Sequence, residues 1–219
     1  MTTSQFTAVA IPKTRFNEII EHLRFNFFAD EPLNSGVGLC KKGESHLELE
    51  NHCLSTLKQG YSRMLVTDDG TKEIKFQIAG LTLNGITKKG EREEVVRRLA
   101  TIDDEKFKII FGLLYQVNDK VDLFKKYCTD ELFDCRILSV DEEFRGRGLA
   151  NILMADTIDI AKRAGFQVMK ADATGVFSQK VFEKHGFKTE AEIMYSELPD
   201  DIRPALPHRS LKLMAMLLN

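Results

Sequence analysis

Apolar and polar residues follow one another along the chain with two periods, one near two residues and one near 3.6 residues. The first period is typical of a strand with one buried face, and the second of a helix that buries one side. Short apolar or alternating runs predict seven strands, at residues 6–11, 61–67, 74–83, 135–140, 166–171, 187–195 and 211–218. The turn Asp68-Asp69-Gly70 between the second and third runs indicates a β-hairpin.

Between these strands lie segments with the helical period. The first expected helix runs from Pro12 to before Pro32, and the second runs from a capping box of Ser45 and Glu48 to Gly60. The third begins at a cap at Asp103 or Asp104 and continues through Phe124. The fourth runs from the turn at 145–148 to Ala164, and the fifth runs from a cap at Ser178 to Gly186. The third helix is long, with apolar residues on one side from Phe107 to Phe124. Pro32 cannot continue a helix and keeps Glu31 out of the helical region.

Composition limits the class of protein. The chain has 219 residues, 43% of them hydrophobic, so we expect one core and a single domain over residues 1–219. A net charge of −2 disfavours nucleic acid or an anionic membrane as the main partner. Neither a leader pattern nor an apolar run of membrane-spanning length is visible. We therefore expect a cytoplasmic protein that acts as a monomer or weak dimer.

The cysteines indicate a reducing environment rather than a metal site. Cys40, Cys53, Cys128 and Cys135 have no C-x-x-C spacing, so free thiols are expected. Two histidines and two of these cysteines do cluster in the sequence, namely His46, His52, Cys40 and Cys53. Zinc is an alternative for this cluster, but the spacing matches no standard site, and we predict no metal.

The turn Arg145-Gly146-Arg147-Gly148-Leu149-Ala150 is the strongest candidate for ligand binding. It follows the apolar run 135–140 and opens a helix, so unpaired N–H groups and the helix dipole favour an anion there. The glycines allow close approach, and the arginines offer planar forks to phosphate. A P-loop string is absent, a dinucleotide motif lacks its third glycine because Asn151 stands there, and a plain surface turn is the remaining alternative.

This turn has the form [RQ]-x-x-G-x-[GA], and so it resembles the acetyl-CoA motif of the GNAT superfamily of N-acetyltransferases. The resemblance implies that the pyrophosphate of coenzyme A rests on the turn and that the preceding strand splays open for the pantetheine arm. The implied cofactor-binding residues are Leu138, Ser139 and Val140, through their main chain, with Arg145, Gly146, Arg147, Gly148, Leu149, Ala150, Asn151 and Ser178. The N–H near Val140 would support the oxyanion.

A second motif supports the same resemblance. Residues 182–187 read Phe-Glu-Lys-His-Gly-Phe, similar to the Y-E-K-x-G-F helix of the superfamily. Phe182 replaces the tyrosine that often protonates the leaving thiolate, so another group must act as the acid. The order of predicted elements also matches, over essentially the whole chain. The expected fold is therefore the α/β (α+β) GNAT fold, a central mixed twisted sheet of about seven strands flanked by helices.

An amine needs a base before it attacks a thioester, because about one alkylamine in a thousand is neutral at pH 7. Glu31 is the candidate. The string Asp30-Glu31-Pro32-Leu33-Asn34 resembles a segment of the insect arylalkylamine N-acetyltransferases, which acetylate dopamine, serotonin, tyramine and octopamine. That resemblance implies that Glu31 is the general base. It also implies catalytic hydroxyls four residues apart, at Thr174, where the dopamine enzyme has serine, and at Ser178. A helix cap is the alternative role of Ser178.

The expected reaction is direct transfer of acetyl from acetyl-CoA to a small primary amine in a ternary complex. The cysteines lack a neighbouring His-Asp pattern, which disfavours a covalent acyl-enzyme. A polyamine or agmatine acyltransferase is the first alternative, favoured if acidic residues line the amine entrance, whereas Phe27, Phe28 and Tyr195 there would favour aryl amines. A non-catalytic acyl-CoA sensor is the second alternative, and it would have no need for Glu31.

Overall fold

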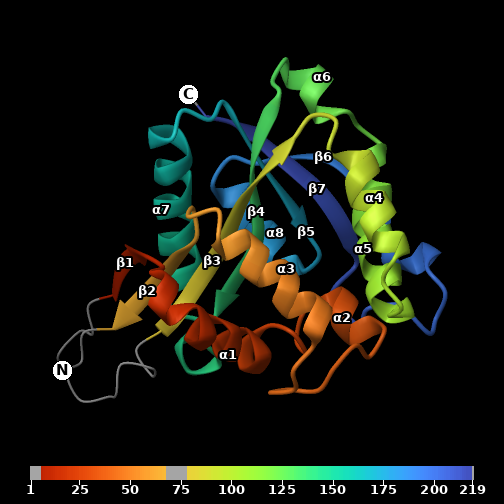
Figure 1. The fold of residues 1–219 in the computed structure, drawn as a ribbon, viewed down its shortest axis with the longest axis horizontal. Coiled ribbons are helices and arrows are strands. Elements are labelled where there is room, and N and C mark those ends of the chain that lie inside the picture. The colour runs from red at the N-terminus through yellow and green to blue at the C-terminus, as the bar shows by residue number, and fades with distance from the viewer. Residues whose placement is uncertain (1–5, 68–77, 219) are drawn as a thin grey trace.

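The computed structural model describes residues 6–67 and 78–218, and Figure 1 shows its fold. The strands are β1 (Phe6–Ala10), β2 (Arg63–Thr67), β3 (Ile78–Lys88), β4 (Glu131–Val140), β5 (Val168–Ala173), β6 (Lys188–Met194) and β7 (Ser210–Leu217). The α-helices are α1 (Phe16–Asn26), α2 (Pro32–Gly36), α3 (Leu47–Leu57), α4 (Arg92–Ala100), α5 (Glu105–Asp119), α6 (Leu123–Tyr127), α7 (Leu149–Arg163) and α8 (Val176–Lys184). Short 3-10 turns occupy Lys13–Arg15, Glu142–Phe144 and Tyr195–Glu197.

The strands form one mixed sheet in the order β1-β2-β3-β4-β5-β7-β6. Neighbouring strands are antiparallel except β4 and β5, which are parallel and joined by α7. A parallel pair needs a crossover, and a helix usually supplies it. The predicted mixed sheet flanked by helices is confirmed.

Helices cover both faces of this sheet (Figure 1). α7 and α8 pack on one face, where Phe133, Met169 and Ala171 of the central strands meet Met154 and Phe182 of these helices. α1, α3 and α5 pack on the other face. There the apolar side of α1 is buried, as its 3.6-residue pattern predicts, and α5 packs against β7. In the described part of the chain, no helix is long and apolar enough to cross a membrane.

One of these predicted helix caps, at Ser45, and the predicted long helix are wrong. α3 begins after His46, whose Nδ1 accepts from Leu49 N, because the Ser45 hydroxyl instead donates to Glu50 Oε1 at 2.7 Å. The long third helix is two helices: α5 ends at Asp119, and Asp122 caps α6. Of the two caps proposed for α5, Asp104 is the one, accepting from Phe107 N at 2.9 Å.

Strand boundaries also differ from the prediction. β3 is described from Ile78 and continues to Lys88, since pairing with β4 extends it through polar residues. β4 begins at Glu131 rather than at Cys135. The predicted turn at 68–70 and the predicted strand residues 74–77 lie outside the described residues. Two helices that were not predicted, α2 and α4, complete the fold.

Candidate active site

The parallel strands β4 and β5 separate toward their carboxyl ends. Their pairing covers only Phe133 with Met169 and Asp134 with Lys170, although β4 continues to Val140. Beyond that point β4 pairs with β3 alone, and Asp141 N donates to Ala79 O at 3.0 Å. The sequence expectation of a strand that splays open therefore has a counterpart in this structure.

Hydrogen-bond alternation decides which main-chain groups of β4 face the gap. In an antiparallel pair, alternate residues bond to the partner strand while the residues between them point away. Since Asp141 bonds to β3, Ser139 does so too, and Leu138 and Val140 direct their N–H and C=O groups toward β5. The Ser139 side chain is buried and lies 3.0 Å from His22 Nε2. Leu138 and Val140 are thus the main-chain partners open to a pantetheine arm.

The turn after β4 provides an open helix start. Gly146 and Gly148 have φ of 76° and 78°, values that favour glycine, and Gly148 is the N-cap of α7. No described side chain caps this helix, and a Cβ on either glycine would meet nothing within 4 Å. The first N–H groups of α7 therefore face open space, as an anion site requires. Asn151 adds a buried Oδ1 that has no hydrogen-bond partner among the described residues.

The other residues of the turn are held by the protein itself. Arg145 donates from Nε to Val140 O at 3.1 Å and from Nη2 to Asp30 Oδ2 at 3.1 Å, so its fork bridges the turn to the segment that carries Glu31. Arg147 donates to a main-chain carbonyl and stacks over the Phe144 ring. The Leu149 side chain is buried in the core, which leaves only its main chain for a ligand. Ala150 lies in the first turn of α7.

Glu31 is a buried carboxyl at the start of α2. It has extended backbone, as the following proline predicts, and the residue is 9% exposed. Oε2 accepts from Asn34 N at 2.7 Å, whereas Oε1 is buried without a hydrogen-bond partner among the described residues. Burial raises the pKa of Glu31, and the nearby Thr174 hydroxyl and the amides of Asn34 and Leu33 only partly oppose it.

The two predicted hydroxyls lie on either side of the start of α8. Thr174 lines the same cavity as Glu31, and its carbonyl accepts from Tyr195 Oη at 2.7 Å. Ser178 lies in the first turn of α8, where its hydroxyl donates to Gly175 O at 2.9 Å. The alternative role of Ser178 as N-cap is wrong, because Gly175 holds that position. Phe182, at the usual tyrosine position, is buried in the core.

Beside Glu31 opens a cavity of about 1180 Å³ between α3, α5 and the face of the sheet. Its apolar and aromatic lining includes Phe27, Leu33, Tyr61, Phe107, Phe111, Tyr115, Phe124 and Ile137. Of the aromatic residues expected at the entrance, Phe27 lines this cavity. Phe28, in the turn after α1, and Tyr195, directly after β6, instead belong to the buried core.

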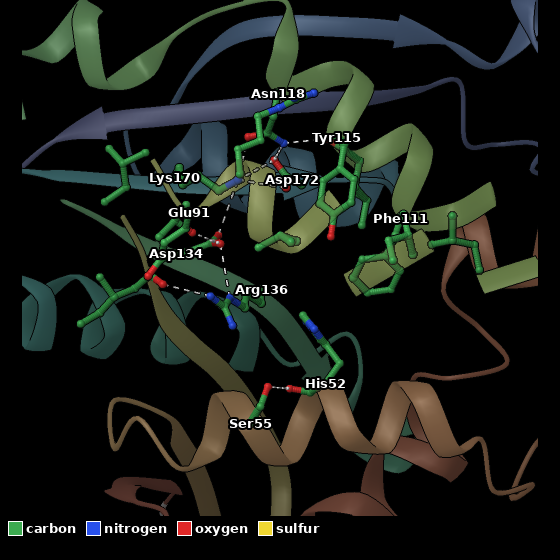
Figure 2. A pocket seen from close by; sticks show the side chains of 18 of the residues that line it. His52, Ser55, Glu91, Phe111, Tyr115, Asn118, Asp134, Arg136, Lys170 and Asp172 are labelled. Carbon is green, nitrogen blue, oxygen red and sulfur yellow. Dashed lines mark hydrogen bonds and ion pairs between the residues drawn. The ribbon is translucent and has the colours of Figure 1, made fainter. Parts of the chain in front are cut away.

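A charged cluster lines the cavity on the strands β4 and β5, as Figure 2 shows. Lys170 Nζ lies 3.0 Å from Asp172 Oδ2 and 2.9 Å from Asn118 Oδ1, and Arg136 reaches Asp134. Burial opposes the charge on Lys170, but the two aspartates outweigh it and raise the pKa of its ammonium. Sequence reasoning missed this cluster. Its signal was a charged residue at every second position of two otherwise apolar strands.

The histidines and cysteines considered for the zinc alternative do not form a metal site in the described residues, where no group of three or more His, Cys, Asp or Glu side chains could hold a metal ion. His46 pairs with Asp104, at 2.9 Å from Nε2 to Oδ2. His52 lines the cavity, and burial lowers its pKa to about 4. Cys53 is buried, and all four cysteines are free thiols.

Comparisons with known proteins agree with this geometry. The acetyltransferase (GNAT) family profile matches residues 114–187. Arylalkylamine N-acetyltransferase 2 from Aedes aegypti is 44% identical, with 98% of this chain and 100% of that chain covered and a TM-score of 0.92. A mosquito arylalkylamine N-acetyltransferase-like 5b (23% identity, TM-score 0.84) and a Drosophila melanogaster polyamine N-acetyltransferase (20%, 0.83) share the fold, each covering 98% of this chain and 100% of its own. The chain therefore belongs to the GNAT family of acetyltransferases, in its arylalkylamine N-acetyltransferase branch, and is an acyltransferase.

Proposed function

We propose that the protein is an arylalkylamine N-acetyltransferase in which one domain, residues 1–219, transfers acetyl from acetyl-CoA to a small primary amine. The amines are those of the dopamine, serotonin, tyramine and octopamine class, and transfer occurs directly in a ternary complex. The observation that carries the proposal is the buried Glu31 carboxyl, with one unbonded oxygen, beside an aromatic-lined cavity.

Glu31 acts as the general base in this proposal. Oε2 is held by the Asn34 amide, so Oε1 is the oxygen available to take the ammonium proton, directly or through water. A carboxyl whose pKa is raised by burial is a stronger base than an ordinary carboxylate, and it still ionises as the pH rises. A solvated glutamate would be a weaker base for an ammonium near neutral pH.

The residues of the β4–α7 turn fit acetyl-CoA. The open N–H groups at Gly148 to Ala150 would hold the pyrophosphate, and the Leu138 main chain, with the Val140 carbonyl that also accepts from Arg145, would hold the pantetheine amides. When bound, acetyl-CoA supplies the activated carbonyl that the amine attacks and carries away the thiol. The Val140 N–H, which faces the gap between β4 and β5, is the donor available to that carbonyl oxygen.

The leaving thiolate needs a proton, and Phe182 has none to give. Ser178 is the group we assign as acid or proton relay. Within the described parts of the chain its hydroxyl bonds to Gly175 O alone, so a small rotation redirects the proton without breaking a buried ion pair. Thr174 has a different role in the proposal: its hydroxyl favours the charged form of Glu31 and keeps that pKa from rising further.

The cavity lining favours aryl amines over polyamines. Acidic residues do stand at its rim, including Glu91, Glu94 and Asp119, but Lys88, Lys89, Arg92 and Arg98 lie among them. Arg92 pairs directly with Asp119. A rim of mixed sign does not select a polycation, whereas an aromatic wall suits a planar ring.

A panel of amines tests the proposal. Dopamine, serotonin, tyramine, histamine and agmatine are each mixed with acetyl-CoA, and release of free thiol is followed at one acetyl-CoA concentration. We expect the three aryl amines to give the highest kcat/KM. Faster transfer to agmatine would replace the proposal with the polyamine alternative, and binding of acetyl-CoA without transfer to any amine would contradict it.

A further inference from the structure

The charged cluster in the amine cavity lies far from the base. Thr174, Asp172 and Lys170 occupy alternate positions of β5 or its end, and all three line the cavity. Thr174 adjoins Glu31, and Lys170 lies four residues earlier, about 13 Å along an extended strand. The cluster therefore faces the far end of any amine whose nitrogen lies at Glu31.

Lys170 has one N–H that its neighbours leave unused. The side chain is 5% exposed, and its ammonium carries three donors. Asn118 Oδ1 accepts one at 2.9 Å, and the two oxygens of the Asp172 carboxylate, at 3.0 and 3.2 Å, share a second because they lie too close together for two tetrahedral N–H bonds to address them separately. Among the described residues the third N–H therefore has no acceptor at hydrogen-bond distance. The next acceptor, Asp134 Oδ1, stands 4.0 Å from Nζ, which is too long for a hydrogen bond.

Asp134 is the other half of this arrangement. It is 7% exposed, and its Oδ2 accepts from Thr87 Oγ1 at 3.0 Å and lies 3.4 Å from Arg136 Nε. Among the described residues no donor bonds to Oδ1, which faces Lys170. Figure 2 shows both side chains directed into the cavity, with Tyr115 and Phe111 projecting into it from α5. A donor and an acceptor thus lie 4.0 Å apart, close enough for one oxygen atom beside them to bond to both.

The charges of this pair select one kind of ligand group. An ammonium would meet Lys170, a carboxylate would meet Asp134, and a C–H would leave both polar groups unpaired. A hydroxyl both accepts and donates, so it satisfies the two at once. We infer that Lys170 and Asp134 bind a hydroxyl on the aromatic ring of the amine substrate, and so determine specificity for hydroxylated over unsubstituted aryl amines. This inference rests on the proposed function.

Paired substrates test the inference on the protein as it is. The kcat/KM for tyramine is compared with that for phenethylamine and for 4-fluorophenethylamine, whose substituent cannot donate to Asp134. We expect wild type to prefer tyramine by about tenfold or more over both, since a water molecule can replace the hydroxyl only in part. Equal values for the three amines would overturn the inference and leave the proposed function standing.

Variants then assign the preference to the pair. Asp134→Asn keeps the size and an acceptor for Thr87 but turns one acceptor into a donor, so the preference for tyramine should fall by about tenfold. Lys170→Met should also abolish it, while Ser55→Ala, elsewhere on the cavity wall, should leave it unchanged. The ratio of the kcat/KM for tyramine to that for phenethylamine does not depend on how much of the enzyme is folded. An unchanged ratio in Asp134→Asn would overturn the inference, and no transfer to either amine by wild type would overturn the proposed function together with it.

Discussion

The turn that opens α7 and the cavity beside Glu31 are built in opposite ways. The turn is one continuous segment, residues 145–151, and it offers main-chain groups and open space. The cavity is assembled from side chains of the α1–α2 segment, α3, α5, β4 and β5, which are far apart in the sequence. The first region therefore depends on local backbone conformation, and the second depends on the packing of the whole fold.

The two regions nevertheless touch. Arg145 of the turn bonds to Asp30, the neighbour of the base, and Asn26 at the end of α1 accepts from Glu142 N at 2.9 Å. His22 in α1 reaches Ser139 in the splayed strand. These contacts fix where the base stands relative to the turn. A substitution in the turn should thus change mainly the binding of acetyl-CoA, and a substitution in the cavity should change mainly the reaction of the amine. A substitution at the contacts between the two regions should change both slightly.

The largest expected effect is on catalysis at Glu31, without a matching effect on acetyl-CoA binding at the turn. Glu31→Gln removes the base, so kcat/KM for the preferred amine should fall by about 100-fold or more, with the residual rate rising at higher pH. Acetyl-CoA affinity, measured by calorimetry, should stay within about twofold. Glu48→Gln, which changes another carboxyl of the same cavity, is the matched control and should retain the rate. Unchanged turnover of Glu31→Gln at neutral pH would exclude Glu31 as the base.

Much of the fold could be predicted from sequence, because most elements carry a clear apolar period. α1 and α7 have buried faces at the expected spacing. α4 was missed for a different reason: five of its nine residues are charged and none is buried, so its few apolar residues do not indicate a core-facing helix. The end of β3 at Lys88 was missed because its pairing with β4, rather than its composition, makes it a strand.

The site divides in the same way. The 145–151 turn and the Glu31 segment are contiguous motifs, so both could be recognised in the sequence as candidate sites. The Lys170–Asp134 pair is a contact between two strands that are joined by the crossover 141–167, and no local sequence pattern predicts that their side chains meet. The role of Ser178 as cap was mispredicted since a serine one turn into a helix and a serine at its start look alike in sequence.

A pair of glycines isolates the role of the turn. Gly148 and Gly165 lie at the two ends of α7, with φ of 78° and 83°, and each has open space where a Cβ would lie. Alanine at either position should lower the free energy of unfolding by a similar amount, about 1 to 2 kcal/mol. Only Gly148→Ala should weaken acetyl-CoA binding, by roughly tenfold, because its methyl group occupies the approach to the helix start. Equal affinity in both variants would remove the turn from the cofactor site.

The two hydroxyls at α8 should act on different parts of the pH–rate profile. Thr174→Val removes a group that favours ionised Glu31, so the pKa of Glu31 rises further and the acid limb shifts to higher pH. Ser178→Ala should lower the plateau by several-fold without shifting that limb, as loss of a proton donor does. Rates for both variants between pH 5 and pH 9 distinguish these effects. A shifted limb in Ser178→Ala would assign that hydroxyl to the base instead.

The smallest expected effect tests the contact between the two regions. Burial, and then the charge of Arg145, lowers the pKa of His22 to about 4. The unfolded chain binds this proton near pH 6.5 and the folded chain does not, so between those values the free energy of unfolding falls with falling pH. The slope is at most about 1.4 kcal/mol per pH unit for one histidine. His22→Gln should remove the part of the pH dependence that His22 contributes. The part contributed by His52, which has a similarly lowered pKa, should remain.

Urea denaturation of both proteins at pH 7.5, 6 and 5 measures that difference. At pH 7.5 the variant should be less stable by about 1 kcal/mol, because one buried hydrogen bond to Ser139 is changed. Toward pH 5 the gap should narrow, since only wild type then loses the free energy associated with His22. Acetyl-CoA affinity and the KM for the amine should each change by less than about threefold. A large change in one constant alone would mean that His22 belongs to that region rather than to the contact between the two.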